Sequence, residues 1–249
     1  MIIYTWNVNG IRAACAKTFM NFIKDESWDI ICLQEIRCNE SQFPQDLYNF
    51  CISNNIRIYW NSSIVKQGYA GTAILSKIPL NNATNYFDDK IMMGEGRIIT
   101  AELKNFNLIT AYIPNSKREF ERLDIRCQIE DKILSYLKSE TPCIYCGDLN
   151  AVVEDKDIYN PTLKAPGNSS QEREKINNIL KSGFVDAFRY KHKEIKYSWF
   201  SNFGNARENN TGWRLDYFIV SEQLKERIVD CDIINYKGSD HLPVKLELR

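Results

Sequence analysis

The sequence lacks the features that mark several whole classes of protein. It has no excess of either charge, because 32 Lys and Arg residues stand against 32 Asp and Glu residues, whereas polyanion-binding domains are often basic overall. No stretch approaches the ~20 uncharged apolar residues that a membrane-spanning helix needs. The first ten residues, MIIYTWNVNG, contain no charged segment and no small-residue cleavage site. We therefore expect a protein without a membrane partner, in the bacterial cytoplasm or nucleoid or in a eukaryotic nucleus.

Cysteines at characteristic spacings are scarce as well. The eight cysteines are scattered through apolar segments instead of forming a framework of loops. The one CxxC spacing, Cys143 and Cys146, lies in TPCIYCGD. If this segment is a strand, residues three apart point to opposite faces, so the two thiols cannot bind one metal. The pattern favours buried structural cysteines.

Histidine is rarer still, with two in 249 residues. His192 lies in the charged run YKHKE, which predicts a solvated surface side chain. His241 follows Asp240 in KGSDHLPV near the end of the chain. This pair is compatible with the capped beginning of a strand and equally with a catalytic imidazole.

Short apolar runs rich in Ile, Tyr, Trp and Val alternate with amphipathic stretches along the whole chain, and no low-complexity linker interrupts them. Eleven strands are predicted at residues 1–8, 28–34, 57–63, 71–76, 97–103, 106–113, 142–148, 197–201, 213–220, 232–236 and 242–248. About four helices are expected, three of them at residues 17–25, 119–138 and 171–183, and the longest places Phe120, Leu123, Cys127, Leu134 and Leu137 on one stripe. These elements predict an α/β fold over residues 1–249, a single-domain, four-layer α/β/β/α sandwich of two packed, mostly antiparallel or mixed sheets flanked by helices.

Polar side chains follow many of these strands at the point where each one ends. Single Asn and Asp residues at such positions are ordinary, because chains turn there. Taken together they form a set of carboxylates, carboxamides, one phenol and one imidazole. The set comprises Asn7, Asn9, Glu35, Tyr112, Asn115, Asp148, Asn150, Asp216, Asp240 and His241.

This set of groups favours metal-assisted cleavage of a phosphate ester. The sequence offers no Ser-His-Asp candidate and no Cys/His cluster, whereas carboxylate and amide oxygens are the ligands that Mg²⁺ prefers. Phosphate ester cleavage also requires a group that deprotonates water, donors for the non-bridging oxygens, and stabilisation of the leaving oxygen. The strand-end residues include candidates for each of these tasks.

Eight short motifs spread from residue 6 to residue 244 resemble one known family. They are WNVNGIRA, LQE, GYAGTAILS, AYIPN, GDLNA, SQER, TGWRLDYFIVS and GSDHLPV. In this order they resemble the exonuclease III family of apurinic/apyrimidinic (AP) endonucleases, within the wider endonuclease/exonuclease/phosphatase superfamily. GWRLDYF is closer to the branch of the main human AP endonuclease.

The resemblance implies a specific activity. A member of this family hydrolyses the phosphodiester 5′ to an abasic site in duplex DNA and leaves a 3′-hydroxyl, with Mg²⁺ as cofactor and Mn²⁺ as a substitute. It further implies 3′–5′ exonuclease and 3′-phosphodiesterase activity in base excision repair, by a monomer.

The same resemblance assigns roles around the metal. Glu35 would be the principal Mg²⁺ ligand with Asn7 beside it, and Asp240 would contact a second metal or the leaving group. The residues placed at the metal are Asn7, Glu35, Asp148, Asn150, Asp240 and His241.

Catalytic roles follow in the same way. Asp148 would activate the attacking water with help from Asn150, and His241 would donate to a non-bridging phosphate oxygen. Asp216 would hold the His241 ring and favour its protonated form. Tyr112 would contact the phosphate, together with Asn115.

The substrate side is carried by aromatic and basic residues. Trp199, Trp213 and Leu215 resemble the wall that receives an extruded baseless sugar, although core packing of an aromatic-rich strand also accounts for the tryptophans. The positions that would insert into or brace the DNA are Tyr69, Arg118 and Phe203, and those available for phosphates are Arg12, Lys66, Lys117 and Arg214.

Two departures from the family pattern concern the metal and the DNA. Asn9 stands where many members have Asp, which removes one charge near the metal. Residues 160–170 carry Ala165 and Asn168 in place of the Asn and Phe of many relatives. A loop at this position would approach the DNA, so the change bears on abasic-site preference more than on hydrolysis.

Two alternative functions are compatible with part of the pattern. A phosphatase or phosphodiesterase of the superfamily, acting on inositol phosphates, lipids or RNA tails, would share Glu35, Asp148 and His241. A non-catalytic DNA-binding relative would have lost some of the metal and water-orienting residues. The presence of the motifs WNVNGIRA and GWRLDYF argues against a phosphatase or phosphodiesterase. The presence of all the metal and water-orienting residues argues against a non-catalytic relative.

Overall fold

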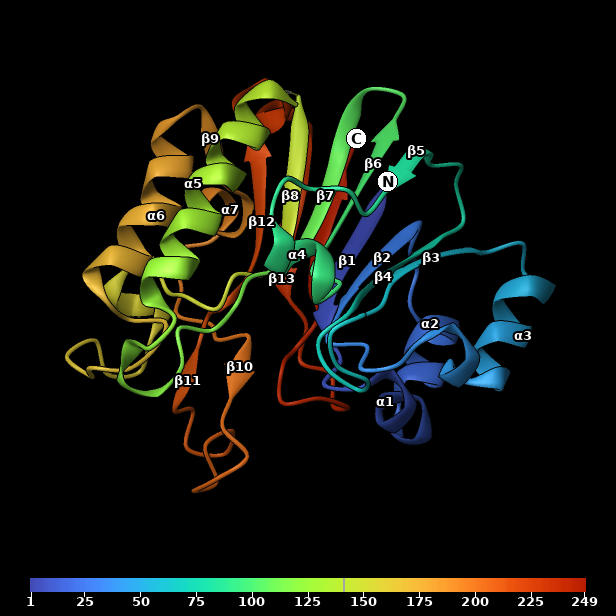
Figure 1. Ribbon diagram of the computed structural model, residues 1–249, viewed down its shortest axis with the longest axis horizontal. Helices are drawn as coiled ribbons and strands as arrows, with labels where there is room; N and C mark the ends of the chain where they lie inside the picture. The colour runs from blue at the N-terminus through green and yellow to red at the C-terminus, as the bar shows by residue number, and fades with distance from the viewer. Residues whose placement is uncertain (141) are drawn as a thin grey trace.

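Two six-stranded sheets packed face to face form the centre of the molecule (Figure 1). The computed structural model describes residues 1–140 and 142–249. The first sheet has the order β13-β14-β1-β2-β4-β3. Its strands are β1 (Ile2–Asn7), β2 (Ile30–Gln34), β3 (Arg57–Asn61), β4 (Thr72–Ser76), β13 (Ile228–Ile233) and β14 (Val244–Leu248).

The second sheet has the order β5-β6-β7-β8-β12-β9. Both sheets are mixed, because β1 pairs with β2 and β7 with β8 in parallel while the neighbouring pairs are antiparallel. The strands of the second sheet are β5 (Asn81–Thr84), β6 (Ile98–Leu103), β7 (Phe106–Tyr112), β8 (Cys143–Asp148), β9 (Phe184–Asp186) and β12 (Asp216–Ser221). A separate two-stranded ribbon consists of β10 (Trp199–Phe200) and β11 (Gly212–Trp213).

Helices cover the outer face of each sheet, which gives the predicted four layers. Figure 1 shows α5 and α6 over the second sheet and α1, α2 and α3 beside the first. The α-helices of the described residues are α1 (Ile11–Lys17), α2 (Phe19–Asp25), α3 (Gln45–Ser53), α4 (Lys90–Gly94), α5 (Leu123–Ser139), α6 (Ser170–Lys181) and α7 (Ala187–Lys191). None of these helices is long and apolar enough to cross a membrane.

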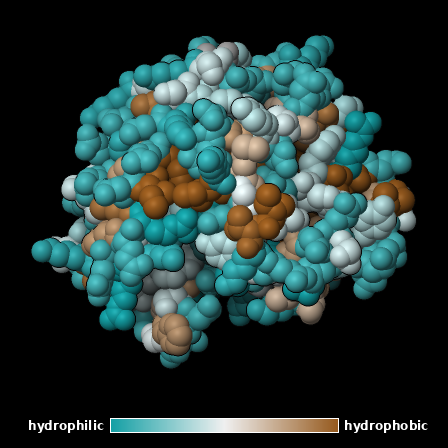
Figure 2. All heavy atoms as spheres, viewed as in Figure 1, coloured by the Kyte–Doolittle hydropathy of each residue, from teal (hydrophilic) through white to brown (hydrophobic). Residues whose placement is uncertain are grey.

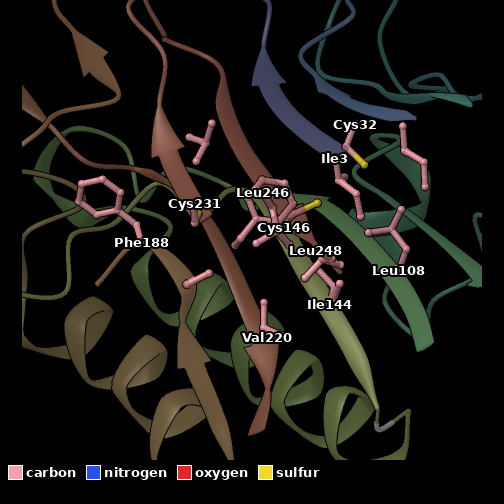
Figure 3. Close-up of a cluster of buried hydrophobic side chains, with 14 of the residues drawn as sticks. Ile3, Cys32, Leu108, Ile144, Cys146, Phe188, Val220, Cys231, Leu246 and Leu248 are labelled. Carbon is pink, nitrogen blue, oxygen red and sulfur yellow. The ribbon is translucent and has the colours of Figure 1, made fainter. Parts of the chain in front are cut away.

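The core follows the alternation of side chains along the strands. Ile3 and Cys146 point into the layer between the sheets (Figure 3). Their chain neighbours Tyr4 and Tyr145 belong to the outer layers under the helices. Successive residues of a strand face opposite sides, so apolar residues at every position bury both faces of each sheet. This is why the strands are nearly continuous hydrophobic runs.

The two cysteines of the CxxC spacing lie on opposite faces of β8, as predicted. Cys146 belongs to the layer between the sheets, together with Cys32, and Cys143 belongs to the layer under α5 and α6. All eight cysteines are free thiols. Residue 141, the first of the quoted segment TPCIYCGD, lies outside the described residues.

Several element predictions were wrong in detail. In α5 the buried face is formed by Arg126, Ile129, Glu130, Ile133 and Leu137, so the predicted stripe matches it only at Leu137. An ion pair between Arg126 and Glu130 makes this interior face partly charged, and a pattern of apolar residues does not reveal that. Six elements were not predicted at all: the helices α1, α3, α4 and α7 and the strands β5 and β9. All except α3 are at most seven residues long, which is too short for a clear periodicity.

The sheet pairings determine where the functional strand ends meet. Asp148 at the end of β8 is the register partner of both Tyr112 at the end of β7 and Asp216 at the start of β12. In the other sheet, Asn7 at the end of β1 pairs with Gln34 at the end of β2. These ends open at one edge of the sandwich, where β10 and β11 extend beyond the sheets in Figure 1.

Candidate active site

Asn7 joins the two sheets at the centre of the site. Its side-chain amide donates to Glu35 Oε1 at 3.1 Å and to Asp148 Oδ2 at 2.9 Å. The Tyr112 hydroxyl donates to the same Glu35 oxygen at 2.6 Å. Asn7 is fully buried, so these bonds satisfy a polar group that would otherwise be costly to bury. Four predicted residues from four different strands or strand ends are therefore in direct contact.

The backbone around these residues takes a conformation that most side chains avoid. Asn9, Glu35 and Asn150 have φ values of 47°, 52° and 50°, in the left-handed region that is uncommon for residues other than glycine. Asn150 N donates to Asp148 Oδ1 at 2.9 Å, and Asn9 N donates to Asn7 Oδ1 at 3.0 Å. The sharp turns after β1 and β8 thus place backbone donors on buried polar side chains. Together with the turn at Glu35, they form a concentration of strain that is common at functional sites.

His241 lies between two carboxylates. Its Nδ1 is 2.9 Å from Asp216 Oδ2, and its Nε2 is 3.8 Å from Asp148 Oδ2. The Ser198 hydroxyl donates to the same Asp216 oxygen at 2.7 Å. Burial alone would lower the pKa of the His241 ring, but Asp216 and Asp148 raise that pKa to about 10. The imidazole is therefore a cation at neutral pH with Nε2 facing Asp148.

Glu35 and Asp148 differ in their readiness to ionise. Burial raises the pKa of Asp148 to about 7; His241 opposes this rise and the neighbouring Asp216 carboxylate adds to it. Burial also disfavours the ionised form of Glu35, yet the hydrogen bond from Tyr112 and the charge of Arg37 hold the pKa of this carboxyl below its usual range. Of these two carboxyls, Glu35 therefore favours its ionised form, whereas Asp148 can exchange a proton near neutrality.

A pocket of about 420 Å³ opens above these groups. Trp213 and Leu215 are each 7% exposed and form its apolar side with Trp199, whose ring meets that of Trp213 edge-on at 6.2 Å between centroids. The full lining is Asn9, Glu35, Arg37, Tyr112, Asn115, Asp148, Asn150, Ala165, Pro166, Trp199, Trp213, Leu215, Asp240 and His241. The apolar wall thus stands directly beside the polar centre.

The predicted DNA-bracing residues lie outside this lining. Phe203 is 85% exposed on the segment between β10 and β11, and Arg12 and Arg118 are also exposed. The Tyr69 hydroxyl is half-buried and accepts a bond from Arg97 at 3.0 Å. The side chains of Arg12, Lys66, Lys117, Arg118 and Phe203 are exposed, whereas Asn115 lines the pocket and donates to Asn150 Oδ1 at 3.2 Å.

Arg214 is not available for phosphates, which corrects the prediction. It is completely buried and forms ion pairs with Asp157 at 2.8 Å and Asp186 at 2.7 Å. Arg214 lies between β11 and β12, where Asp157 and Asp186, both distant in the sequence, neutralise its buried charge.

His192 is not a solvated surface residue either. Its side chain is 25% exposed, and Nε2 lies 2.8 Å from Asp230 Oδ1. His192 is not among the residues that line the pocket, so it is separate from the candidate active site.

Two residues that matter to the site were missed. Arg37 lines the pocket and donates from Nε to Glu35 Oε2 at 2.8 Å. Arg126, fully buried on α5, donates to the carbonyl oxygens of Leu149 at 2.6 Å and Asn150 at 2.9 Å. A basic residue two positions after Glu35 is a weak signal, and nothing in the sequence indicates that Arg126 points inward.

The donor set fits a hard divalent cation. Asp148 and Asp216 each present a carboxylate oxygen within 4.8 Å of the other and of the His241 ring. The protonated ring offers no lone pair to a metal, so the candidate ligands are the oxygens of Asp148 and Asp216 together with Glu35 and Asn7 nearby. Asp216 Oδ1 is buried without a hydrogen-bond partner, which is unusual for a carboxylate oxygen. Carboxylate and amide oxygens in this number suit Mg²⁺ or Mn²⁺ better than softer metals.

A larger hollow of about 520 Å³ lies elsewhere and shares no residue with the centre. It is lined by Tyr86 and Phe87 before α4 and by Lys132 and Tyr136 on α5. Figure 2 shows apolar atoms on this side of the molecule, surrounded by hydrophilic ones. Its size does not make it the site, because chemistry requires the convergent polar groups found in the smaller pocket.

The fold and the centre together place the chain in a known class. A profile of the Endonuclease/Exonuclease/phosphatase family matches residues 4–241. The chain therefore belongs to this family of hydrolases.

Three individual proteins are similar to the chain over nearly its whole length. The chain is 42% identical to the exodeoxyribonuclease of Bacillus subtilis, over 99% of this chain and 98% of that protein. It is 34% identical to the DNA-(apurinic or apyrimidinic site) endonuclease of Dictyostelium discoideum, over 98% of this chain and 69% of that protein. The AP endonuclease of Archaeoglobus fulgidus superimposes with a TM-score of 0.87 at 26% identity and covers 100% of this chain and 99% of that one. The resemblance to the exonuclease III family of AP endonucleases is confirmed.

Proposed function

We propose that the chain is a Mg²⁺-dependent DNA repair nuclease that cleaves the phosphodiester 5′ to an abasic site in duplex DNA and leaves a 3′-hydroxyl. The observation that carries this proposal is the contact between the polar centre and the apolar wall in one pocket. The names of the relatives in Bacillus subtilis and Dictyostelium discoideum support the substrate class. We further propose that residues 1–249 form one catalytic domain and act as a monomer.

Glu35 and Asn7 would hold the cation, with Asp148, Asn150, Asp240 and His241 around it. Bound there, Mg²⁺ would supply positive charge for the phosphate oxygens and the leaving oxygen. Mn²⁺, with the same preference for oxygen ligands, would substitute.

Asp148 and His241 would divide the proton chemistry between them. Asp148 has a pKa of about 7, which suits a group that takes a proton from the attacking water near neutral pH. Asn150 donates to its Oδ1 through the backbone and thereby fixes the carboxylate. His241, kept protonated by Asp216, would donate from Nε2 to a non-bridging oxygen whose negative charge grows in the transition state.

The apolar wall would select the substrate. A sugar without a base leaves the helix at little cost, because no base pair holds it. Trp199, Trp213 and Leu215 would receive this sugar against their apolar side chains, and Tyr112 and Asn115, which line the same pocket, would contact the phosphate. Arg12, Tyr69, Arg118 and Phe203 would contact or brace the duplex, and the exposure of Arg12, Arg118 and Phe203 is compatible with that role.

The test is the cleavage of a duplex that carries one abasic analogue, with Mg²⁺ and with EDTA. We expect nicking on the 5′ side of the analogue in Mg²⁺ and none in EDTA. Glu35→Ala and Asp148→Asn should each abolish most of the activity. Wild-type protein that nicks no faster than these variants would contradict the enzymatic proposal.

The same assay separates the proposed substrate from the alternatives of the superfamily. An undamaged duplex, a 3′-phosphoglycolate end and a soluble phosphoinositide serve as competing substrates at equal concentration. Faster removal of 3′ ends would indicate a 3′-phosphodiesterase or 3′–5′ exonuclease as the main activity. Equal cleavage of the phosphoinositide would preserve the reaction class and refute DNA as the substrate.

A further inference from the structure

The indole of Trp199 makes a polar contact that an apolar wall does not require. Its Nε1 donates to Asp240 Oδ2 at 3.2 Å. The opposite oxygen, Asp240 Oδ1, accepts from Asn9 Nδ2 at 2.8 Å and from Ser239 Oγ at 3.1 Å. Each oxygen of this carboxylate is therefore held by donors from the protein, and an ionised carboxylate has about four sites for them.

The backbone fixes the two residues relative to each other. Trp199 forms an isolated antiparallel bridge with His241, and Phe200 N donates to Asp240 O at 3.0 Å. Leu242 N donates to Ser198 O at 2.6 Å on the other side of the bridge. The strand that carries the wall and the segment that carries Asp240 and His241 are therefore one hydrogen-bonded unit.

The Trp199 indole contacts both the pocket and the Asp240 carboxylate. One face of Trp199 lines the pocket beside Trp213, while its N–H edge lies on Asp240. A carboxylate held at one oxygen only is free to rotate about its Cβ–Cγ bond, because terminal torsions of this kind are broad. Removal of the indole N–H would thus free one oxygen next to His241 while the apolar surface stays.

We propose that Trp199 is a positioning residue that orients the Asp240 carboxylate through its indole N–H, in addition to forming the wall of the pocket. The binding of the sugar against the Trp199 ring and the orientation of Asp240 are then coupled. A substrate that tilts the indole would also break its hydrogen bond to Asp240. Part of the discrimination between substrates would appear in kcat instead of in binding. The kinetic consequence rests on the nuclease activity proposed above, whereas the hydrogen bond itself does not.

The kinetic test compares Trp199→Phe with wild type on the duplex that carries one abasic analogue. Phenylalanine keeps a flat apolar ring and lacks the N–H donor. Hydrogen bonds to charged groups contribute enough to predict a kcat about 10-fold lower, with KM within about 2-fold of wild type. Combined with Asp240→Ala, Trp199→Phe should cause no additional loss, because the two changes remove the same contact.

Trp213→Phe is the matched control, since this second wall indole is not bonded to Asp240 among the described contacts. Its effect should multiply with that of Asp240→Ala. An unchanged kcat in Trp199→Phe, or effects of Trp199→Phe and Asp240→Ala that multiply in the double variant, would overturn the proposal.

A second measurement needs no substrate. In protein labelled with ¹⁵N at the indole nitrogen, the five tryptophans give separate N–H resonances, and Trp199→Phe and Trp213→Phe assign two of them. Asp240→Ala should shift the Trp199 resonance and leave that of Trp213 in place. A Trp199 resonance that does not move would refute the contact. A protein that shows the shift but leaves the abasic duplex intact would refute the nuclease proposal alone.

Discussion

At the scale of single residues, neighbours decide what one type of side chain does. Asp148 and Asp157 are both buried, and burial raises the pKa of each. Asp157 also contacts Arg214 and Arg189, which lower its pKa to about 2, whereas Asp148 has Asp216 beside it and keeps a pKa of about 7. One aspartate is therefore a structural anion, and the other is suited to proton transfer.

His241→Ala should lower kcat by at least ~10²-fold with little change in DNA affinity, because the donor acts on charge that develops in the transition state. Single-turnover cleavage of the abasic duplex gives the rate, and fluorescence anisotropy without metal gives the affinity. His192→Ala is the control, since His192 pairs with Asp230 away from the pocket. A change confined to KM would count against the role of His241.

Asp157 should contribute to stability in a defined range of pH. Its folded pKa of about 2 lies below the usual value of 3.8, so the ionised form stabilises the fold above about pH 4 and this contribution is lost as the pH falls through about 2. Asp157→Asn should reduce the free energy of unfolding by roughly 2 kcal/mol at neutral pH. Urea titrations at several pH values test this, and the difference from wild type should vanish near pH 2. A difference that is independent of pH would contradict it.

At the scale of elements, the loop at 160–170 is organised by Asn168. Its amide donates to the carbonyl oxygens of Pro161 at 3.1 Å and Leu163 at 2.7 Å, and its Oδ1 accepts from Arg173 Nε at 2.9 Å. Within the loop, a Cβ at Gly167 would lie 2.9 Å from the Asn150 carbonyl oxygen. Asn168 therefore has a clear structural task in the loop whose residues Ala165 and Pro166 line the pocket.

Asn168→Ala should loosen this loop without touching the polar centre. We expect KM for the abasic duplex to rise by about 3- to 10-fold, because the four hydrogen bonds of this side chain are lost, while kcat changes by less than ~2-fold. Steady-state kinetics on the abasic duplex measure both. A loss confined to kcat would mean that the loop supports catalysis and not the binding of DNA.

Arg126 of helix α5 supports the turn that follows β8, because it donates to the carbonyl oxygens of Leu149 and Asn150. This side chain is fully buried and also contacts Glu130 at 3.1 Å and Glu172 at 3.7 Å. Arg126→Met removes the positive charge and leaves two buried carboxyls without their partner, so we expect a loss of ~3–5 kcal/mol in the free energy of unfolding. Urea denaturation measures it.

Lys175→Met is the matched control for Arg126→Met. Lys175 pairs with Asp131, which is 58% exposed, and such surface pairs contribute about 0–1 kcal/mol. Equal destabilisation by the two variants would refute a special role for the buried network.

At the scale of the whole molecule, the site is built where the two sheets meet. Glu35 follows β2 of the first sheet, and Asp148 ends β8 of the second. A cation held by both would connect the sheets, so binding should stabilise the entire fold.

Thermal unfolding should therefore respond to divalent cations. At a free Mg²⁺ concentration ten times Kd, the stabilisation is about 1.4 kcal/mol, which corresponds to a rise in Tm of roughly 3–5 °C for a chain of this size. Differential scanning fluorimetry with MgCl₂ and with EDTA measures it. Glu35→Ala should abolish the shift, and Glu102→Ala, at the far end of β6, should retain it. A shift that persists in Glu35→Ala would place the cation elsewhere.

Much of this architecture follows from local pattern. The apolar runs identified most of the long strands, because strands buried on both faces must be continuously hydrophobic. Short elements such as β9 and α7 escaped detection, since three to five residues carry too little periodicity. The buried face of α5 was predicted incorrectly because it contains charged residues, which pair with each other along the helix (Arg126 with Glu130) and with Glu172 of α6.

For the site, the sequence by itself determined which chemical groups are available: the carboxylates, amides, phenol and imidazole at strand ends, and the tryptophans that follow. Only the tertiary structure decided which of them meet. It placed Asn7 between Glu35 and Asp148, buried Arg214 on Asp157, brought Arg37 to Glu35, and put the Trp199 indole on Asp240. The physical reason is that side-chain type and strand period are local properties, whereas contact across two sheets depends on register and packing between distant segments, as for Asn7 and Asp148, which lie 141 residues apart.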